Sequence, residues 1–150
     1  MAHIFSIKPE YCSKIFGGSK SVELRRRISK RVTAGTIMLI YETSPTKAVA
    51  GIALIKEVSS LPINDLWHVA EQKGGITKPL FDQYFAGVES GYAIEICQAV
   101  RFRRPIELSM LTREHGLAAP QSFLTVSDRV AISLIGHGQV SLGHQYPDPY

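Results

Sequence analysis

Residues 18–25 read GSKSVELR, and the stretch PEYCSKIF at 9–16 leads into them. Proline suits the first turn of a helix, because its missing N–H would have no partner there. The apolar residues of PEYCSKIF recur at helical spacing, and the two glycines that follow favour the left-handed conformation that ends helices. Beyond the glycines, apolar residues alternate with charged ones, as in a strand with two different faces. The sequence therefore predicts a helix over 9–16, a glycine turn, and a strand over 21–27 whose charged face carries Glu23, Arg25 and Arg27.

The rest of the chain indicates an α+β protein that is mainly β. The short polar segment 42–47 separates two apolar runs, which predicts an antiparallel hairpin. Helical patterns occur between strands without regular alternation, which argues against a doubly wound sheet and favours a small β-barrel with inserted and flanking helices. Strands are predicted over 3–7, 36–41, 48–58 and 92–102, the last closed by Pro105; helices are predicted over 64–73, 77–85 and 109–115; and 126–135 fits a strand or a helix begun by a cap at 127–128.

Length and composition predict one globular domain over 1–135, followed by an irregular tail over 136–150. The chain has 150 residues, of which 45% are hydrophobic and 20% charged, so wholesale disorder is excluded. No apolar run approaches the roughly 20 residues of a membrane helix. Residues 1–8 favour a strand over a signal peptide. We therefore expect a cytoplasmic protein without a membrane partner.

Basic residues are unevenly distributed along this chain of net charge +4. Lys20 and the segment 25–31 hold one cluster, and the segment 101–104 holds a second. Clustered cations attract polyanions such as nucleic acids. A solvated surface strand and loop would carry the same residues, so the clusters alone leave both interpretations open.

The motif at 18–25 supplies a candidate site. A glycine turn lets backbone N–H groups approach an anion, and Gly18 stands in that turn. Lys20 and Arg25 flank Glu23, so their charges should lower the pKa of its carboxyl group. The carboxylate would accept hydrogen bonds from a base edge or a sugar hydroxyl, while the two cations hold phosphate. The alternative is a surface ion pair that ties the strand to the turn. If the segment is functional, alanine substitutions of Lys20, Glu23 and Arg25 are expected to impair function with little loss of stability.

GSKSVELR fits the pattern G-x-K-x-x-E-x-R, and the chain thereby resembles the ASCH domains, a family of PUA-like β-barrels linked to RNA. The resemblance is strong over residues 4–56 and weaker to residue 123. Four further stretches carry it, namely IKP at 7–9, KIFGG at 14–18, YETSP at 41–45 and PQSF at 120–123.

The resemblance implies an RNA-binding module with a basic cleft around the motif. Tyr41 would stack on a base, or would be a core tyrosine with its hydroxyl at the rim. No histidine pair has metal-ligand spacing, and we expect neither a metal nor a cofactor. The expected binding residues are Lys8, Gly18, Lys20, Glu23, Arg25, Arg27, Tyr41 and Ser44.

The resemblance also leaves enzymatic alternatives open. Some ASCH relatives are ribonucleases, and Lys20, Glu23 and Arg25 would then form a metal-independent catalytic site for single-stranded RNA. Others are amidohydrolases of acylated cytidine, but those carry a threonine where this chain has Glu23, so the ribonuclease ranks higher. A reader of modified nucleosides would need Tyr41 or Trp67 to stack on the base. Members are also labelled predicted transcriptional regulators, although this sequence has no helix-turn-helix pattern.

Overall fold

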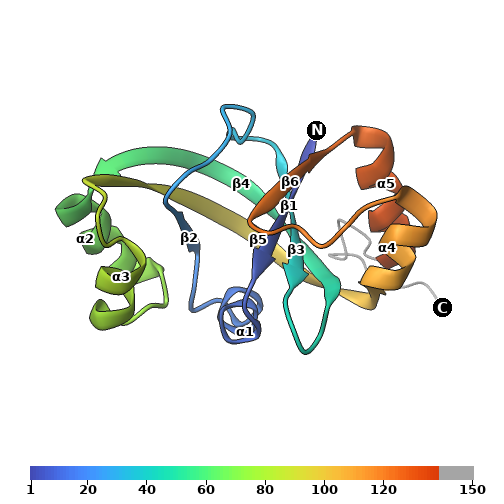
Figure 1. Ribbon diagram of the computed structural model, residues 1–150, viewed down its shortest axis with the longest axis horizontal. Helices are drawn as coiled ribbons and strands as arrows, with labels where there is room; N and C mark the ends of the chain where they lie inside the picture. Colours follow the sequence, from blue (N-terminus) through green and yellow to red (C-terminus); the bar gives the residue numbers. More distant parts are fainter. Residues whose placement is uncertain (139–150) are drawn as a thin grey trace.

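The computed structural model describes residues 1–138, which form one six-stranded sheet with five helices around it (Figure 1). Helices and strands alternate irregularly along the chain, so the protein belongs to the mixed α and β class. No helix within these residues is long and apolar enough to cross a membrane. In chain order the elements are β1 (Ala2–Ile7), α1 (Pro9–Gly17), β2 (Val22–Arg25), β3 (Ile37–Glu42), β4 (Ala48–Pro62), α2 (Ile63–Lys73), α3 (Lys78–Tyr84), β5 (Ser90–Glu107), α4 (Leu108–His115), β6 (Phe123–Val126) and α5 (Asp128–Gly138).

The strands follow the order β2-β5-β4-β3-β1-β6 across the sheet. β1 is parallel to β3, and all other neighbouring pairs are antiparallel, including the predicted hairpin of β3 and β4. The long strands β4 and β5 connect an end covered by α2 and α3 to an end covered by α4 and α5 (Figure 1). Because β2 and β6 are the two edges and do not pair with each other, the predicted barrel is not closed.

Helix α1 and the turn after it form as the sequence predicts. Pro9 begins the helix, and Gly18 ends it with a φ of 89°, a conformation that glycine adopts without strain. The backbone N–H groups of residues 18–20 donate to the carbonyl oxygens of Lys14 and Ile15. These donors complete the end of the helix, so they are not free to hold an anion as the glycine turn suggested.

β2 is shorter than the predicted strand over 21–27. It ends at Arg25, and the chain then leaves the sheet as a loop over 26–36. Arg27 therefore does not share the strand face of Glu23 and Arg25, contrary to the prediction.

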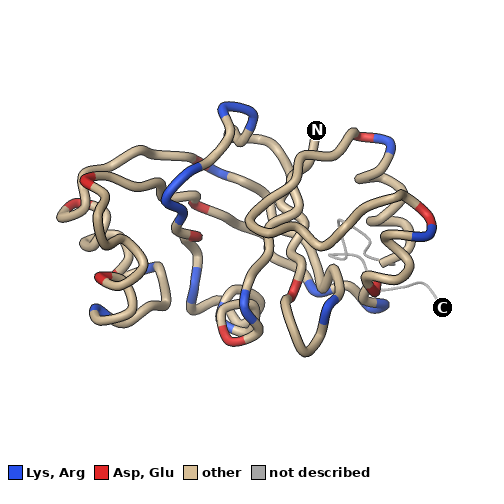
Figure 2. Tube along the Cα trace, in the orientation of Figure 1, with Lys and Arg blue, Asp and Glu red and all other residues tan. Residues whose placement is uncertain are grey.

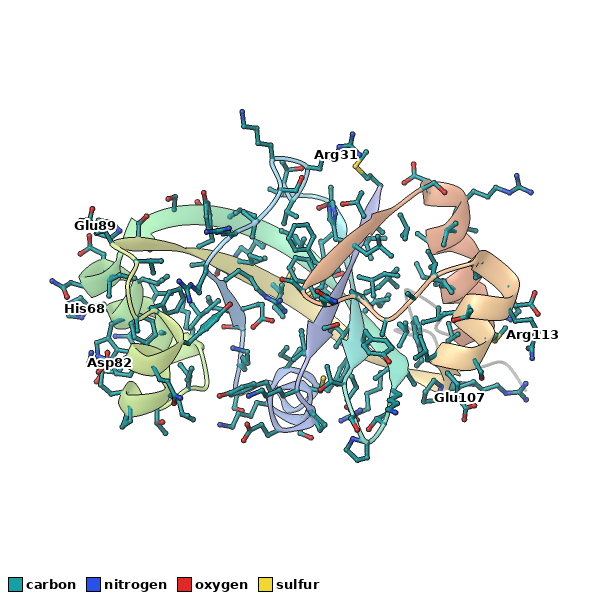
Figure 3. All side chains as sticks on the ribbon, in the orientation of Figure 1. Arg31, His68, Asp82, Glu89, Glu107 and Arg113 are labelled. Atoms are coloured by element: carbon teal, nitrogen blue, oxygen red, sulfur yellow. The ribbon has the colours of Figure 1, made fainter. Side chains whose placement is uncertain are left out.

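The first part of this loop, residues 26–31, carries four exposed cations and is called the basic loop below. It continues the positive charge of β2 toward the start of β3 (Figure 2). Arg31 projects into solvent at its far end (Figure 3). The four cations are Arg26, Arg27, Lys30 and Arg31.

Three apolar clusters form the core. The first lies between the sheet and helices α4 and α5 and includes Leu134. The second packs α1 against the centre of the sheet and includes Phe5. The third lies under α2 and α3, where the buried ring of Phe81 contacts Trp67 and Phe85 at centroid distances of 5.1 and 4.7 Å. This third cluster fixes α3 beside β2, which positions the site described below.

The path of β5 differs from the prediction at Pro105. The strand continues past Pro105 to Glu107. Its pairing with β4 is irregular in this region, since Val49 pairs with Ile106 and Gly51 pairs with Arg101. Pro105 lies in the irregular stretch between these two partners. Its missing N–H therefore interrupts no regular ladder bond.

The C-terminal part resolves the ambiguity of 126–135. β6 was not predicted, and it pairs with β1 immediately before α5. Ser127 accepts a hydrogen bond from the backbone N–H of Val130 at 3.3 Å, which confirms it as the helix cap. Helix α5 runs to Gly138, so the first three residues of the predicted irregular tail are helical. Residues 139–150 of that tail lie outside the described residues.

Gly51 is expected to be irreplaceable in the centre of the sheet. A Cβ atom there would lie 2.3 Å from the carbonyl oxygen of Val100 and 2.6 Å from the ring of Phe16. Gly51→Ala should therefore destabilise the protein by about 1–3 kcal/mol through overpacking. Gly17→Ala is the control, because nothing lies within 4 Å of its added Cβ. Equal urea midpoints for the two variants would contradict this prediction.

Candidate functional site

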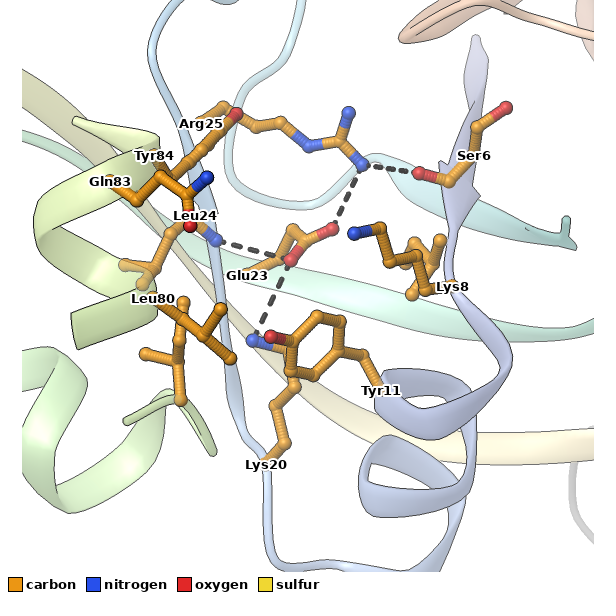
Figure 4. Close-up of a pocket in the computed structure, with 12 residues that line it drawn as sticks. Ser6, Lys8, Tyr11, Lys20, Glu23, Leu24, Arg25, Leu80, Gln83 and Tyr84 are labelled. Carbon is orange, nitrogen blue, oxygen red and sulfur yellow. Dashed lines mark hydrogen bonds and ion pairs between the residues drawn. The ribbon is translucent and has the colours of Figure 1, made fainter. Parts of the chain in front are cut away.

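A pocket of about 430 Å³ lies between β2, the β1–α1 junction and α3 (Figure 4). Four charged side chains line it, three of them cations and one a carboxylate. Its volume falls within the range of small-molecule sites in proteins. The lining residues are Ser6, Ile7, Lys8, Tyr11, Lys20, Glu23, Leu24, Arg25, Ile76, Leu80, Gln83 and Tyr84.

Glu23 forms the charged centre of this pocket, and its side chain is only 9% exposed. Its Oε2 accepts a hydrogen bond from Arg25 at 2.9 Å, and its Oε1 accepts one from the backbone N–H of Leu24 at 3.2 Å. The ammonium group of Lys20 lies 3.6 Å from Oε1. Burial alone would raise the pKa of Glu23, but the charges of Arg25 and Lys20 outweigh it and lower the pKa, as the sequence predicted.

Lys20 connects the site to the loop between α2 and α3. Its ammonium group donates to the carbonyl oxygens of Val22 at 2.9 Å and Gly74 at 2.6 Å. Lys14 donates to the adjacent carbonyl of Gly75 at 2.7 Å. Burial lowers the pKa of Lys20, and the nearby Glu23 partly offsets that effect. The two lysines thus hold α3 in place beside the pocket.

Arg25 connects β2 to two distant parts of the chain. One terminal nitrogen donates to the carbonyl oxygen of Ser6 at 2.8 Å and to Glu23. The other donates to the hydroxyl and the carbonyl oxygen of Ser122, at 3.1 and 3.3 Å. Its guanidinium carbon also lies 5.0 Å from the ring centroid of Phe5. Arg25 therefore supports the tertiary structure as well as lining the pocket.

Burial corrects one sequence-based expectation about the motif. Lys20, Glu23 and Arg25 were expected to be surface residues, but their exposed fractions are 4%, 7% and 8%. We therefore expect alanine substitutions of these residues to perturb the fold, whereas surface positions had led us to expect little loss of stability.

The other predicted binding residues divide into two groups. Lys8 is exposed and lines the pocket, and its amino group points toward Glu23 (Figure 4). Gly18, Arg27 and Ser44 are exposed but do not line it. Tyr41 is a core residue with 3% exposure, so it does not present its ring to a base.

Trp67 does not act as a lid over this pocket. Its ring packs against Phe81, and the Lys78 ammonium lies 5.3 Å from its centroid. The aromatic side chains that do line the pocket are Tyr11 and Tyr84, which the sequence did not single out. Their helices were predicted, but nothing in the sequence indicated which helix faces meet across β2.

Ser6 and Ser122 are further residues that sequence reasoning missed. Ser6 donates its hydroxyl to the carbonyl oxygen of Pro120, and its backbone N–H donates to the carbonyl oxygen of Ser122 at 3.0 Å. Both serines contact Arg25. The only available signal for Ser122 was its place in the segment PQSF at 120–123.

No group of three histidine, cysteine, aspartate or glutamate side chains in residues 1–138 is arranged to hold a metal ion. The second basic cluster lies on β5 away from the pocket, and its Arg101 contacts the ring of Phe16 and pairs with Glu42 at 3.8 Å. The pocket and the adjacent basic loop are therefore the strongest candidate site.

Known proteins share both the sequence and the fold. A family model described as "Domain of unknown function (DUF365)" matches residues 1–129. An ASCH domain-containing ribonuclease of Zymomonas mobilis is 30% identical over 122 residues, which are 81% of this chain and 81% of that protein. The chain belongs to the ASCH domain family. The motif at 18–25 indicated the same family.

The structure of this ASCH domain agrees with that assignment. The crystal structure of ASCH from Zymomonas mobilis matches it with a TM-score of 0.84 and 27% identity, covering 90% of this chain and 94% of that one. The fold is thus PUA-like, with its barrel left open. The N-terminal domain of Staphylothermus marinus McrB shares the fold alone, at a TM-score of 0.60 and 10% identity, with coverage of 90% and 93%.

Proposed function

We propose that this ASCH domain binds single-stranded RNA and holds one unpaired nucleotide in the pocket. The observation that carries the proposal is the pocket itself, where three cations surround one buried carboxylate beside an apolar wall. Sequence-specific RNA recognition commonly uses splayed-out bases that are held by polar edges and apolar surfaces. The 30% identical relative named as a ribonuclease supports RNA as the ligand class.

The basic loop supports the same proposal. The basic loop begins directly after Arg25, so an RNA strand with one nucleotide in the pocket would meet Arg26 and Arg27 next. Segment 26–31 contains no acidic residue that would offset its charge. An electropositive track beside a base pocket is the usual arrangement for single-strand binding.

Ribonuclease activity is the second candidate. It is favoured by the 30% identical relative from Zymomonas mobilis, which is described as a ribonuclease. Lys20, Glu23 and Arg25 would then be the catalytic residues. A general base works best with a pKa near the working pH, whereas the pKa of Glu23 is lowered. Glu23 would therefore orient a hydroxyl by accepting its hydrogen bond rather than remove its proton.

The experiment that tests both candidates uses labelled single-stranded RNA, incubated with and without EDTA and resolved for binding and for cleavage. Binding that weakens steeply with salt supports the RNA-binding proposal, because phosphate contacts release counterions. Cleavage that persists in EDTA supports the metal-independent ribonuclease. Neither binding nor cleavage would contradict both candidates and direct attention to acylated or modified nucleosides.

Lys8→Ala is expected to weaken RNA binding without affecting the fold. Lys8 is exposed at the pocket, and its side chain makes no capping bond to α1. Loss of one phosphate contact should lower the slope of log affinity against log salt by about 1. Lys56→Ala is the matched control, since its side chain is 64% exposed and does not line the pocket. Equal salt slopes for the two variants would show that Lys8 does not contact phosphate.

A further inference from the structure

Lys20 and Arg25, the two buried cations of the pocket, have little donor capacity left for a ligand. An ammonium group has three donors, and Lys20 donates two of them to the carbonyl oxygens of Val22 and Gly74, while Glu23 lies 3.6 Å away as an ion-pair partner. Arg25 has five N–H donors, and the four on its two terminal nitrogens face four acceptors, two for each nitrogen. The sequence suggested that Lys20 and Arg25 would offer their N–H groups to phosphate. Their contacts indicate instead that they hold Glu23 in place.

Glu23 has unused acceptor capacity. A carboxylate offers about four lone-pair sites. Two of them accept the hydrogen bonds from Leu24 and Arg25, and the Lys20 ammonium lies at the longer distance of 3.6 Å. The carboxylate lines the pocket and lies at the centre of its polar side (Figure 4). The pocket thus presents a fixed negative acceptor to whatever enters it.

The geometry points to guanine as the base that this pocket selects. Guanine carries N1–H and the N2 amino group side by side on its Watson–Crick edge, and both are donors suited to a carboxylate. This inference rests on the proposed function, because it names the RNA base that the site recognises. The donors would meet Glu23, and Lys8 at the mouth would meet the phosphate.

The other three bases present acceptors to the same carboxylate. Adenine and cytosine each place an unprotonated ring nitrogen beside the amino group, and uracil flanks its N–H with two carbonyl oxygens. An ionised carboxylate repels those acceptors, and the lowered pKa keeps Glu23 ionised at neutral pH. A buried polar group that pairs with only one base rejects the others strongly.

The remaining lining suits the flat faces of a purine. Ile76, Leu80 and Tyr84 form an apolar wall on the α3 side of the pocket. Tyr11 lies on the other side of Glu23, where the Lys20 ammonium is 5.3 Å from its ring centroid (Figure 4). The base would rest against the wall with its donor edge toward the carboxylate.

Five fluorescein-labelled pentamers test this inference by fluorescence anisotropy. Each is 2′-O-methylated on all five riboses, which prevents cleavage through a 2′-hydroxyl, and carries uridine flanks with a central guanine, adenine, cytosine, uracil or hypoxanthine. The guanine pentamer is expected to bind about tenfold more tightly than those with adenine, cytosine or uracil. Hypoxanthine keeps N1–H but lacks the amino group. The affinity of its pentamer should therefore fall between that of the guanine pentamer and those of the other three.

A protein variant provides the second arm. Glu23→Asp keeps the charge between Lys20 and Arg25 but withdraws the carboxylate by one methylene, so the preference for guanine should fall below about threefold. Glu57→Asp is the control, because Glu57 is exposed on β4 and outside the pocket. If Glu23→Asp fails to fold, the comparison of the five pentamers on the wild type still decides whether the protein prefers guanine.

The outcomes separate this inference from the proposed function. Equal binding of all five pentamers would overturn the guanine preference and leave RNA binding intact. If the protein binds neither the pentamers nor longer single-stranded RNA, both the guanine preference and the proposed RNA binding are overturned. A guanine preference that Glu23→Asp leaves unchanged would overturn the role given to Glu23.

Discussion

Glu23→Ala is expected to destabilise the protein by about 3–5 kcal/mol. Among residues 1–138, the substitution removes the only carboxylate that lines the pocket with Lys20 and Arg25, and both cations are more than nine-tenths buried. Each would keep its charge with carbonyl or hydroxyl oxygens as partners, but without a carboxylate to balance it. Since domains of this kind have total stabilities of about 5–15 kcal/mol, much of the folding free energy would be lost.

Urea denaturation followed by circular dichroism measures this effect. Glu57→Ala serves as the control, because it removes an exposed glutamate from β4 and should change stability by less than about 0.5 kcal/mol. A Glu23→Ala variant as stable as that control would show that the two cations remain hydrated and that the buried ion pairs do not support the fold.

The same ion pairs predict how stability depends on pH. The pKa of Glu23 is lower in the folded protein than its ordinary value of 4.5. The ionised carboxylate therefore contributes stability above pH 4.5, and that contribution is lost as the pH falls through the lowered folded value. Between pH 6 and pH 3, the wild type should lose more stability than Glu23→Gln does.

Leu80→Trp is expected to abolish most RNA binding while leaving the fold intact. Leu80 is 45% exposed and forms part of the apolar wall of the pocket, so an indole there would occupy the space of a base. Loss of one held base costs about 1–3 kcal/mol, which corresponds to about five- to 150-fold in affinity. Binding of labelled single-stranded RNA to both proteins measures the effect.

Val100→Trp is the matched control for this substitution. Val100 is another exposed apolar residue, at 40%, and it lies on β5 outside the pocket. Both tryptophan variants should unfold at the temperature of the wild type, but only Leu80→Trp should lose affinity. If Leu80→Trp binds RNA normally, the pocket is not the base site, and the basic loop would remain as the contact surface.

These contrasts follow from the double role of the motif. Lys20, Glu23 and Arg25 line the pocket and also join β2 to the α2–α3 loop and to Ser122. Their alanine variants would lose function whether or not the residues contact RNA. Substitutions at the mouth, such as Lys8 and Leu80, report on the site without that ambiguity because both residues are exposed.

The sequence determined the features that depend on neighbours in the chain. Helix α1, its glycine cap at Gly18 and the hairpin of β3 and β4 were all predicted, because spacing, capping and a short connection act locally. The alternation in β2 also placed Glu23 and Arg25 on one face, and their proximity predicted the direction of the pKa shift.

Only the tertiary structure decided what covers that face. Lys20 bonds to Gly74, which is 54 residues away, and Arg25 bonds to Ser122, which is 97 residues away. No local pattern specifies such partners, so the motif was predicted to be on the surface. The same reason explains why the sequence left two interpretations of Tyr41 open, a base-stacking residue and a core residue. Its strand was predicted correctly, and distant core residues decide the matter by enclosing its side chain. Periodicity determines which residues share a face, whereas the packing of remote segments determines whether that face meets water or protein.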